Sequence, residues 1–337
     1  MKKAMGSTLV KAARDYRWLL GVWLVVALFA VVTALWSSHV GVPLRDPYGV
    51  LFRRRLTGAL GLFALFAVVD ASVRTGRRGW TVAKAAVELR RRWPKERLAI
   101  ALSGLLAYHI VYVCYRNLKS WVAFNDPYDD DLLRLDTWLF FGHSPAVLLH
   151  ELLGEQLAAH VLGEIYISFT HLVPLSFVAA LVFAERIRDG YVLLMSAMWV
   201  WILGVGSYYL IPTLGPFASA PQDFAQLPYT EITATQTRYL TERAYLLEHP
   251  GAHHAFASIS AFASLHVGFT GMVLLTMRYF GLRRATQVTT VYLVGIIVAT
   301  IYFGWHFVVD DFAGMALSFL AVLFGRMVIY PTGRGSP

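Results

Sequence analysis

The stretch "IYFGWHFVVDDFAG", residues 301–314, lies in an apolar region of the chain and contains one histidine and two aspartates. Ionisable side chains are costly inside a membrane, so their presence in such a run favours a functional role. The rest of the sequence is equally apolar: the 337-residue chain is 57% hydrophobic, which is too high for an ordinary soluble domain. We therefore expect a membrane protein whose polar site lies between spanning helices.

Runs of apolar residues give the number of spans, because a membrane-spanning helix needs about 20 of them. The sequence contains about eight such runs by this criterion, which predicts an all-α, polytopic membrane protein with both termini on one side. We expect the spans near residues 18–36, 56–73, 97–115, 160–184, 190–211, 258–279, 286–305 and 308–327.

Basic residues predict the orientation, because Lys and Arg in short loops stay cytoplasmic. The segment "RTGRRGWTVAKAAVELRRRWPKER" follows the second expected span, and "MKKAMGSTLVKAARDYR", "ERIRD", "RYFGLRR" and "GRMVIYPTGRGSP" fall on the same face. The other face holds "NDPYDDD" and "PQDF". We therefore expect a multi-pass protein of the cell membrane with cytoplasmic termini. The net charge of +9 follows from this topology and from anionic headgroups, so no nucleic-acid partner is expected.

Two long segments are expected on the outer face, at 116–157 and 212–257. In the first, "TWLFFGHSPAVLLHELLGEQL" repeats its apolar residues at three- and four-residue spacing, which predicts helices along the interface. The second opens with "PTLGPFASAPQDFAQLP", whose prolines and glycines exclude a regular helix, and continues with a predicted helix around "TQTRYLTERAYLLEH". Both segments are placed to cover a site on that face.

Two histidines and an aspartate of the last spans form the predicted site. His306 and Asp310 are four residues apart, so on a helix they share a face, where the carboxylate can fix the tautomer of the imidazole. His266 stands near the start of the sixth span, and the chain turns at "RYFGLRR" before it returns to His306. Both histidines therefore come to the outer face, in a recessed pocket or beside a tilted seventh span.

This constellation predicts phosphoryl transfer that needs neither a metal nor another cofactor. One imidazole, oriented by the carboxylate, acts as nucleophile, and the second acts as acid for the leaving oxygen. The N-terminus of the sixth span offers free backbone N–H groups to an anion, and Ser264 adds a hydroxyl donor. The lone Cys114 cannot form an internal disulfide and is expected to be a buried apolar residue.

The same residues resemble a known family. "SLH", followed about 40 residues later by "HFVVD", is similar to the Ser-Gly-His and His-x-x-x-Asp signatures of the type 2 phosphatidic acid phosphatase superfamily. The surrounding "ASLHVG" and "TIYFGWHFVVDDFAG" resemble most the branch that contains fungal inositol phosphorylceramide synthase. In that branch Leu, here Leu265, replaces the glycine, and Thr, here Thr300, replaces an arginine of the phosphatases.

The resemblance implies a division of the chain and a role for each site residue. It implies a six-helix catalytic membrane domain at 97–327, after an N-terminal two-span extension with a basic cytoplasmic loop at 1–96 and before a cytoplasmic tail at 328–337. It also implies that His306 attacks phosphorus to give a phosphohistidine, that Asp310 orients His306, and that His266 protonates the leaving group and then activates the acceptor.

One phosphatase signature is missing from the chain. The Lys-x6-Arg-Pro element does not occur, so no motif identifies the cationic phosphate clamp. Arg116 and Lys119, just outside the third expected span, are the candidates for this clamp. Contact with lipid headgroups at the interface is their alternative role.

Other classes of function compete with this prediction. "NDPYDDD" resembles the magnesium-binding segment of membrane prenyltransferases, but the next acid of that pattern falls on Leu133. Ser264 with His306 could form an intramembrane protease dyad, although no Gly-x-Ser-x-Gly-like loop accompanies it. The two histidines with the neighbouring carboxylates could hold a transition metal. A non-enzymatic lipid transporter or binding protein would place its polar groups at mid-membrane.

The sequence favours an integral-membrane enzyme that acts on a membrane lipid. The donor is expected to be a phospholipid or a polyprenyl phosphate, and a phosphate or a phospho-headgroup such as phosphoinositol moves to an alcohol. A lipid or polyprenyl (pyro)phosphate phosphatase, with water as the acceptor, is the alternative.

Overall fold

The computed structural model describes residues 16–76 and 79–333, in which every regular element is helical. This confirms the prediction of an all-α, polytopic membrane protein. The basic segment at 1–15 and the last residues of the predicted tail, 334–337, lie outside the described residues. The helices are α2 Arg17–Val40, α3 Val50–Gly76, α4 Val82–Arg92, α5 Lys95–Trp121, η1 Val122–Phe124, α6 Asp129–Leu139, α7 Pro145–Leu153, α8 Leu157–Phe183, α9 Ile187–Leu210, α10 Pro216–Ser219, η2 Pro221–Phe224, α11 Glu231–Glu248, α12 Leu265–Tyr279, α13 Arg283–Tyr302 and α14 Val308–Ile329.

Seven helices of the described chain are long and apolar enough to cross a membrane, namely α2, α3, α5 (with η1), α8, α9, α13 and α14. They correspond to seven of the eight predicted runs. The eighth, 258–279, requires a correction, because α12 begins only at Leu265 and has 15 residues. The segment "ASISAFAS", residues 257–264, is apolar and largely buried but not helical. Hydropathy could not distinguish a buried helix from a buried non-helical segment.

The shortness of α12 explains the unequal depths of the two histidines. Its 15 residues span only about 22 Å, less than the roughly 30 Å of a hydrocarbon core. Non-helical backbone at such depth is tolerated where protein surrounds it, as it does at Ser258 and Ser260, which are each 8% exposed. The N-terminus of α12 is therefore recessed, and the site next to it is recessed too.

Helix α9 lies at the centre of the bundle and packs against α5, α8, α12 and α14. Helix α14 also packs closely on α12. This close approach requires a glycine at 314, because a Cβ there would stand 2.4 Å from the carbonyl oxygen of Ser264. Packing of this kind, between small residues, is typical of membrane helices. It brings the N-terminus of α14 against the N-terminus of α12.

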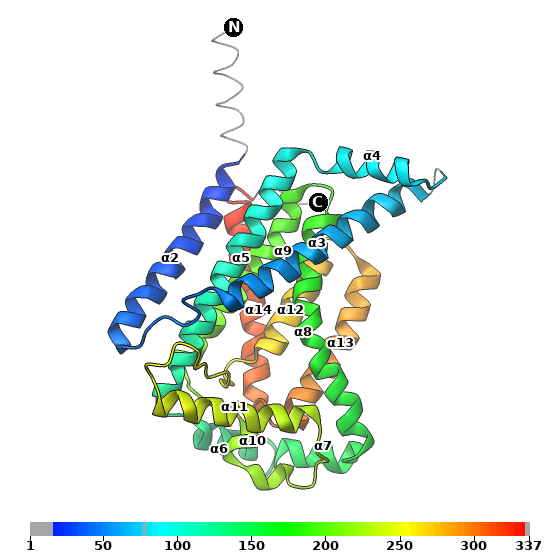
Figure 1. Cartoon of the computed structure of the whole chain (residues 1–337). Helices are drawn as coiled ribbons and strands as arrows, with labels where there is room; N and C mark the ends of the chain where they lie inside the picture. The colour runs from blue at the N-terminus through cyan, green and yellow to red at the C-terminus, as the bar shows by residue number, and fades with distance from the viewer. Residues whose placement is uncertain (1–15, 77–78, 334–337) are drawn as a thin grey trace.

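The helices outside the spans gather at the two ends of the bundle (Figure 1). At one end lie α4, the beginning of α2 and the end of α14, as expected if both termini share a side. At the other end lie α6, α7, α10 and α11, which belong to the two segments predicted to cover the site. Which end faces the cytoplasm stays a prediction, and so does the division into an extension, a catalytic domain and a tail.

Helix α5 differs from its predicted extent, because it continues to Trp121 and includes Arg116 and Lys119. The polar residues in its last turns do not end it, since they bond within the helix. Asn117 Nδ2 donates to the carbonyl oxygen of Val113 at 2.9 Å, and Ser120 Oγ donates to that of Arg116 at 2.9 Å. Both candidate cations are thus held on a helix rather than on a loop.

Candidate active site

His306 lies in the turn between α13 and α14, residues 303–307, which we call the His306 turn. Gly304 adopts a φ of +65°, and a Cβ there would stand 2.2 Å from the Phe224 ring, so only glycine fits this position. The carbonyl oxygen of Gly304 accepts the N–H of Phe217 at 2.9 Å. The turn is therefore fixed against α10 and η2 on the covering side.

The carboxylate of Asp310 is the closest acid to His306, with Oδ2 3.4 Å from the Nδ1 of His306. Asp310 has no exposed surface and also accepts the N–H of Phe307 at 3.0 Å. The sequence predicted this pairing from one face of a helix, but α14 begins at Val308, after the histidine. The contact is instead made at the start of the helix, where Asp310 reaches back toward the turn in the manner of a capping residue.

His266 is the second residue of α12, and its ring centroid lies 5.9 Å from that of His306. Two aromatic rings of α8 hold it in place. Tyr166 stacks on the imidazole with a centroid distance of 4.4 Å, and Phe169 lies 4.3 Å away. The structure thus brings the two histidines that the sequence singled out together, one from the start of α12 and one from the turn after α13.

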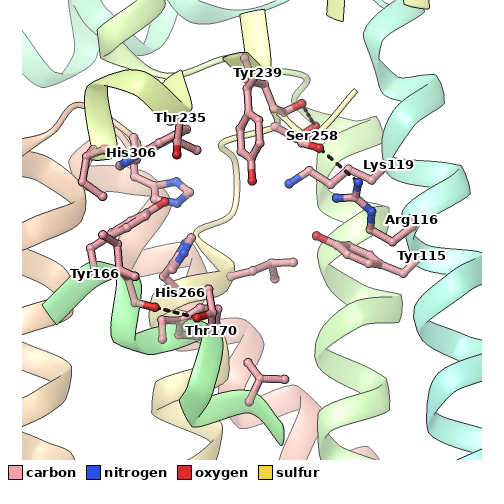
Figure 2. A pocket seen from close by; sticks show the side chains of 18 of the residues that line it. Tyr115, Arg116, Lys119, Tyr166, Thr170, Thr235, Tyr239, Ser258, His266 and His306 are labelled. Carbon is pink, nitrogen blue, oxygen red and sulfur yellow. Dashed lines mark hydrogen bonds between the residues drawn. The ribbon is translucent and has the colours of Figure 1, made fainter. Parts of the chain in front are cut away.

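Both imidazoles line a cavity of about 350 Å³. Figure 2 shows His266 and His306 on one side of this space, with Lys119 and Arg116 opposite them. Arg116 donates to the hydroxyl of Ser258 at 3.2 Å. The ammonium of Lys119 lies 5.1 Å from the ring centroid of Tyr208. The two cations predicted as clamp residues therefore face the histidines across one cavity.

Ser264 and Leu265 take different places at the start of α12. Leu265 lines the cavity. Ser264 is completely buried and does not line it; its Oγ accepts the N–H of Val267 at 3.4 Å, and its own N–H donates to the carbonyl oxygen of Asp310 at 2.9 Å. Ser264 thus caps α12 and joins it to α14, and its direct contact with a phosphate stays a prediction. The N–H groups of Leu265 and His266 precede the first intrahelical bond and are suited to an anion.

Thr300, at the position of the phosphatase arginine, is also completely buried. Its hydroxyl donates to Asp311 Oδ2 at 3.0 Å, so this second acid of the "DD" pair is bonded to α13. Neither residue lines the histidine cavity. The cations of the cavity come from α3, α5 and α11, and none of them comes from α13.

The sequence did not identify three residues that fix the His306 turn from outside. Asp136 of α6 accepts the N–H of Val308 at 3.0 Å through Oδ2. Burial raises the pKa of Asp136 to about 6, although hydrogen bonds from Val308 and Val309 act in the opposite direction. A carboxylate at the N-terminus of α14 also interacts favourably with the helix dipole. Asp136 thus fixes the helix that carries Asp310.

His150 and Gln236 are the other two residues that the sequence did not reveal. His150 Nε2 donates to the carbonyl oxygen of Tyr302 at 2.8 Å, and Gln236 Nε2 donates to that of Phe303 at 2.7 Å. These carbonyls belong to the end of α13, where they have no intrahelical partner. The covering helices α7 and α11 therefore fix the backbone where the His306 turn begins, and α6 fixes the backbone where it ends.

The acid-rich segment "NDPYDDD" has a structural role at Asp129. Its carboxylate accepts the N–H of Leu214 at 2.9 Å and that of Gly215 at 2.7 Å. This fixes the loop that leads to α10. In the described part of the chain, no three His, Cys, Asp or Glu side chains are grouped in a way that could hold a metal ion.

Comparison with known proteins gives the family of the chain. A family model described as the PAP2 superfamily matches residues 130–324, which include both histidines and Asp310 and leave Arg116 and Lys119 outside. No curated protein and no solved structure matches the chain. The match covers more than half of a polytopic helical chain, and the chain belongs to the PAP2 superfamily, whose activity is of the lipid phosphatase or phosphotransferase kind.

Proposed function

We propose that this protein is an integral-membrane lipid phosphotransferase that works through a phosphohistidine on His306 and needs no metal. It transfers a phosphate or a phospho-headgroup, with phosphoinositol as one option, from a lipid donor to an alcohol. The observation that carries the proposal is the pairing of His306 and His266, whose ring centroids lie 5.9 Å apart, in a cavity that Lys119 and three arginines also line.

In the first step the lone pair of an imidazole nitrogen of His306 attacks phosphorus. The bond between phosphorus and the leaving oxygen breaks, and His266 gives that oxygen a proton. Asp310, 3.4 Å from Nδ1, orients the His306 ring and stabilises the positive charge that develops on it. The products are a free alcohol and a phosphohistidine.

In the second step His266, now unprotonated, removes the proton of the acceptor hydroxyl. The acceptor oxygen attacks phosphorus, the bond between phosphorus and nitrogen breaks, and His306 returns to its starting state. Lys119, Arg116 and the N-terminal N–H groups of α12 lie around the cavity, where they can offset the charge on the phosphoryl oxygens.

The acceptor separates this proposal from its alternative, a lipid or polyprenyl phosphate phosphatase. The walls beside His266 are aromatic: Tyr166 stacks on His266, and Trp305 lies parallel to Tyr166 with ring centroids 5.6 Å apart. Such walls limit the space for water next to the reacting nitrogen and suit a larger alcohol. We place the protein in the cell membrane, with its termini cytoplasmic and the site toward the outer face.

The test is to incubate purified protein with a labelled mixture of phosphatidic acid, polyprenyl phosphates and phosphatidylinositol, with and without EDTA. We expect a new phospholipid, little free phosphate and no effect of EDTA. Free phosphate alone would establish the phosphatase alternative. Inhibition by EDTA that Mg²⁺ or Zn²⁺ reverses would contradict the metal-independent mechanism.

A variant pair shows whether the chemistry belongs to this site. His306→Ala should abolish turnover and still bind lipid, whereas His171→Ala, on the exposed side of α8, should behave as the wild type. Lipid binding without turnover in the wild type would indicate a transporter or lipid-binding protein instead.

A further inference from the structure

A second cavity, of about 650 Å³, adjoins the histidine cavity. The two share Arg55, Arg116, Arg238, Tyr239 and Ser258 in their walls, so they lie side by side. The second cavity extends away from the histidines, toward the residues of α11 and the loop after it. The site is therefore larger than a single phosphoryl group requires.

Three arginines from three different helices meet where the two cavities join. Arg55 of α3 lies over the ring of Tyr112, 4.2 Å from its centroid. Arg116 of α5 contacts Ser258, and the Nε of Arg238 on α11 lies 3.8 Å from a carboxylate oxygen of Glu242. Among the described residues, no carboxylate oxygen lies within 4.0 Å of Arg55 or Arg116.

Positive charge exceeds negative charge along these walls. Only Glu231 and Glu242 supply carboxylates to the lining of the two cavities, while Lys119 adds a fourth cation to the three arginines. Cations that lie close together repel one another unless an anion binds between them. Guanidinium groups are suited to that anion, because their planar donors match the oxygens of a phosphate.

Arg55 belongs to the two-span extension that precedes the predicted catalytic domain, and this extension is bonded to segments near the site. Arg45, in the loop between α2 and α3, is 2% exposed and donates to the carbonyl oxygens of Pro250 at 2.8 Å and Ala252 at 2.7 Å. Its backbone N–H donates to Asn117 Oδ1 at 2.6 Å. The loop before α3 is therefore bonded to α5 and to the loop after α11, and this fixes the start of the helix that carries Arg55.

We propose that Arg55 and Arg238, next to the clamp residue Arg116, form a second anion subsite, which binds a second phosphate group of the lipid substrate. The transferred group is assigned to His306, Lys119 and Arg116, so Arg55 and Arg238 are left for another anion. The substrate then carries two phosphate groups, either adjacent in a diphosphate or separated on a phosphorylated headgroup. This inference rests on the proposed function for the nature of the ligand.

Binding to the inactive His306→Ala variant tests the subsite without turnover. The dissociation constants of two matched pairs are measured in detergent micelles: farnesyl phosphate with farnesyl diphosphate, and phosphatidylinositol with its 4-phosphate. We expect the doubly phosphorylated member of one pair to bind about 10-fold or more tightly, as hydrogen bonds to charged groups allow. Preference within the first pair identifies a diphosphate, and preference within the second identifies a phosphorylated headgroup.

The arginines are tested in the same background with Arg55→Ala/Arg238→Ala. In this double variant, the ratio of the two dissociation constants within the preferred pair should fall close to one. Arg53→Ala/Arg54→Ala is the control, because it removes the same amount of charge from neighbouring positions of α3 that line neither cavity. This variant should retain the preference for the doubly phosphorylated lipid.

Equal affinities within both pairs, or an equal loss of preference in the two double variants, would overturn the subsite. Either result would leave the transfer reaction at His306 standing. Conversely, absence of turnover in the wild type would remove the proposed reaction and leave the binding preference measurable.

Discussion

The carboxylate of Asp136 on α6 accepts the N–H of Val308, the first residue of α14, at 3.0 Å across 172 positions of the chain. Two residues before Val308 stands His306, and two residues after it stands Asp310. One side chain outside the histidine cavity therefore holds the backbone that carries the proposed nucleophile and the acid proposed to orient it.

We predict that Asp136→Ala lowers kcat by about 10- to 100-fold while KM changes little, because small displacements of reacting groups cost rate. Steady-state kinetics on the lipid substrate measures this split. Asp131→Ala is the matched control, since Asp131 lies on the same helix, pairs with Arg134 and is exposed. A larger effect on KM than on kcat, or an equal loss in the control, would contradict the positioning role.

Asp136 should also give stability a specific pH dependence. Burial raises its pKa from 3.8 to about 6, so the folded state binds the proton more readily than the unfolded state does. The stabilisation is then fully present below pH 3.8 and is lost as the pH rises through about 6. The difference in unfolding free energy between the wild type and Asp136→Asn should fall from pH 4 to pH 7 in thermal melts. A constant difference would mean that the pKa of Asp136 is not raised.

His266→Ala tests the acid of the first step. We expect the departure of an alkyl alcohol to slow by about 10²- to 10⁴-fold, the usual contribution of general acid catalysis. A nitrophenyl leaving group needs little protonation, so its release should be much less affected. Rapid-quench measurement of both substrates makes the comparison, and equal losses for the two leaving groups would remove His266 from the acid role.

The spans and the pairing of His306 with Asp310 could be predicted because each depends on local sequence. Apolar runs of sufficient length mark seven of the helices, and His306 with Asp310 stands out as charge within such a run. The start of α12 could not be located from hydropathy, since "ASISAFAS" is buried whether or not it is helical. Ser264, a good N-cap residue, was the only local signal for that boundary.

The residues that fix the His306 turn had no local signal. Asp136, His150 and Gln236 bond to backbone atoms that are 172, 152 and 67 positions away, and no spacing rule connects such partners. The same limit applied to Arg55, because nothing in the three adjacent arginines before the second span indicates that one of them reaches a cavity next to α11. Three-dimensional packing alone brings these groups together.

The two adjacent acids of α14 should differ in importance for the His306 reaction. Asp310 lies 3.4 Å from the Nδ1 of His306, whereas Asp311 accepts a hydrogen bond from Thr300. We expect Asp310→Asn to lower kcat by less than His306→Ala, which removes the nucleophile, and by more than Asp311→Asn. Because Asp310 acts through His306, the double variant should be no worse than His306→Ala alone. Steady-state kcat values of these variants, measured on one lipid, decide which acid orients the His306 ring. A greater loss of kcat in Asp311→Asn than in Asp310→Asn would assign that role to Asp311.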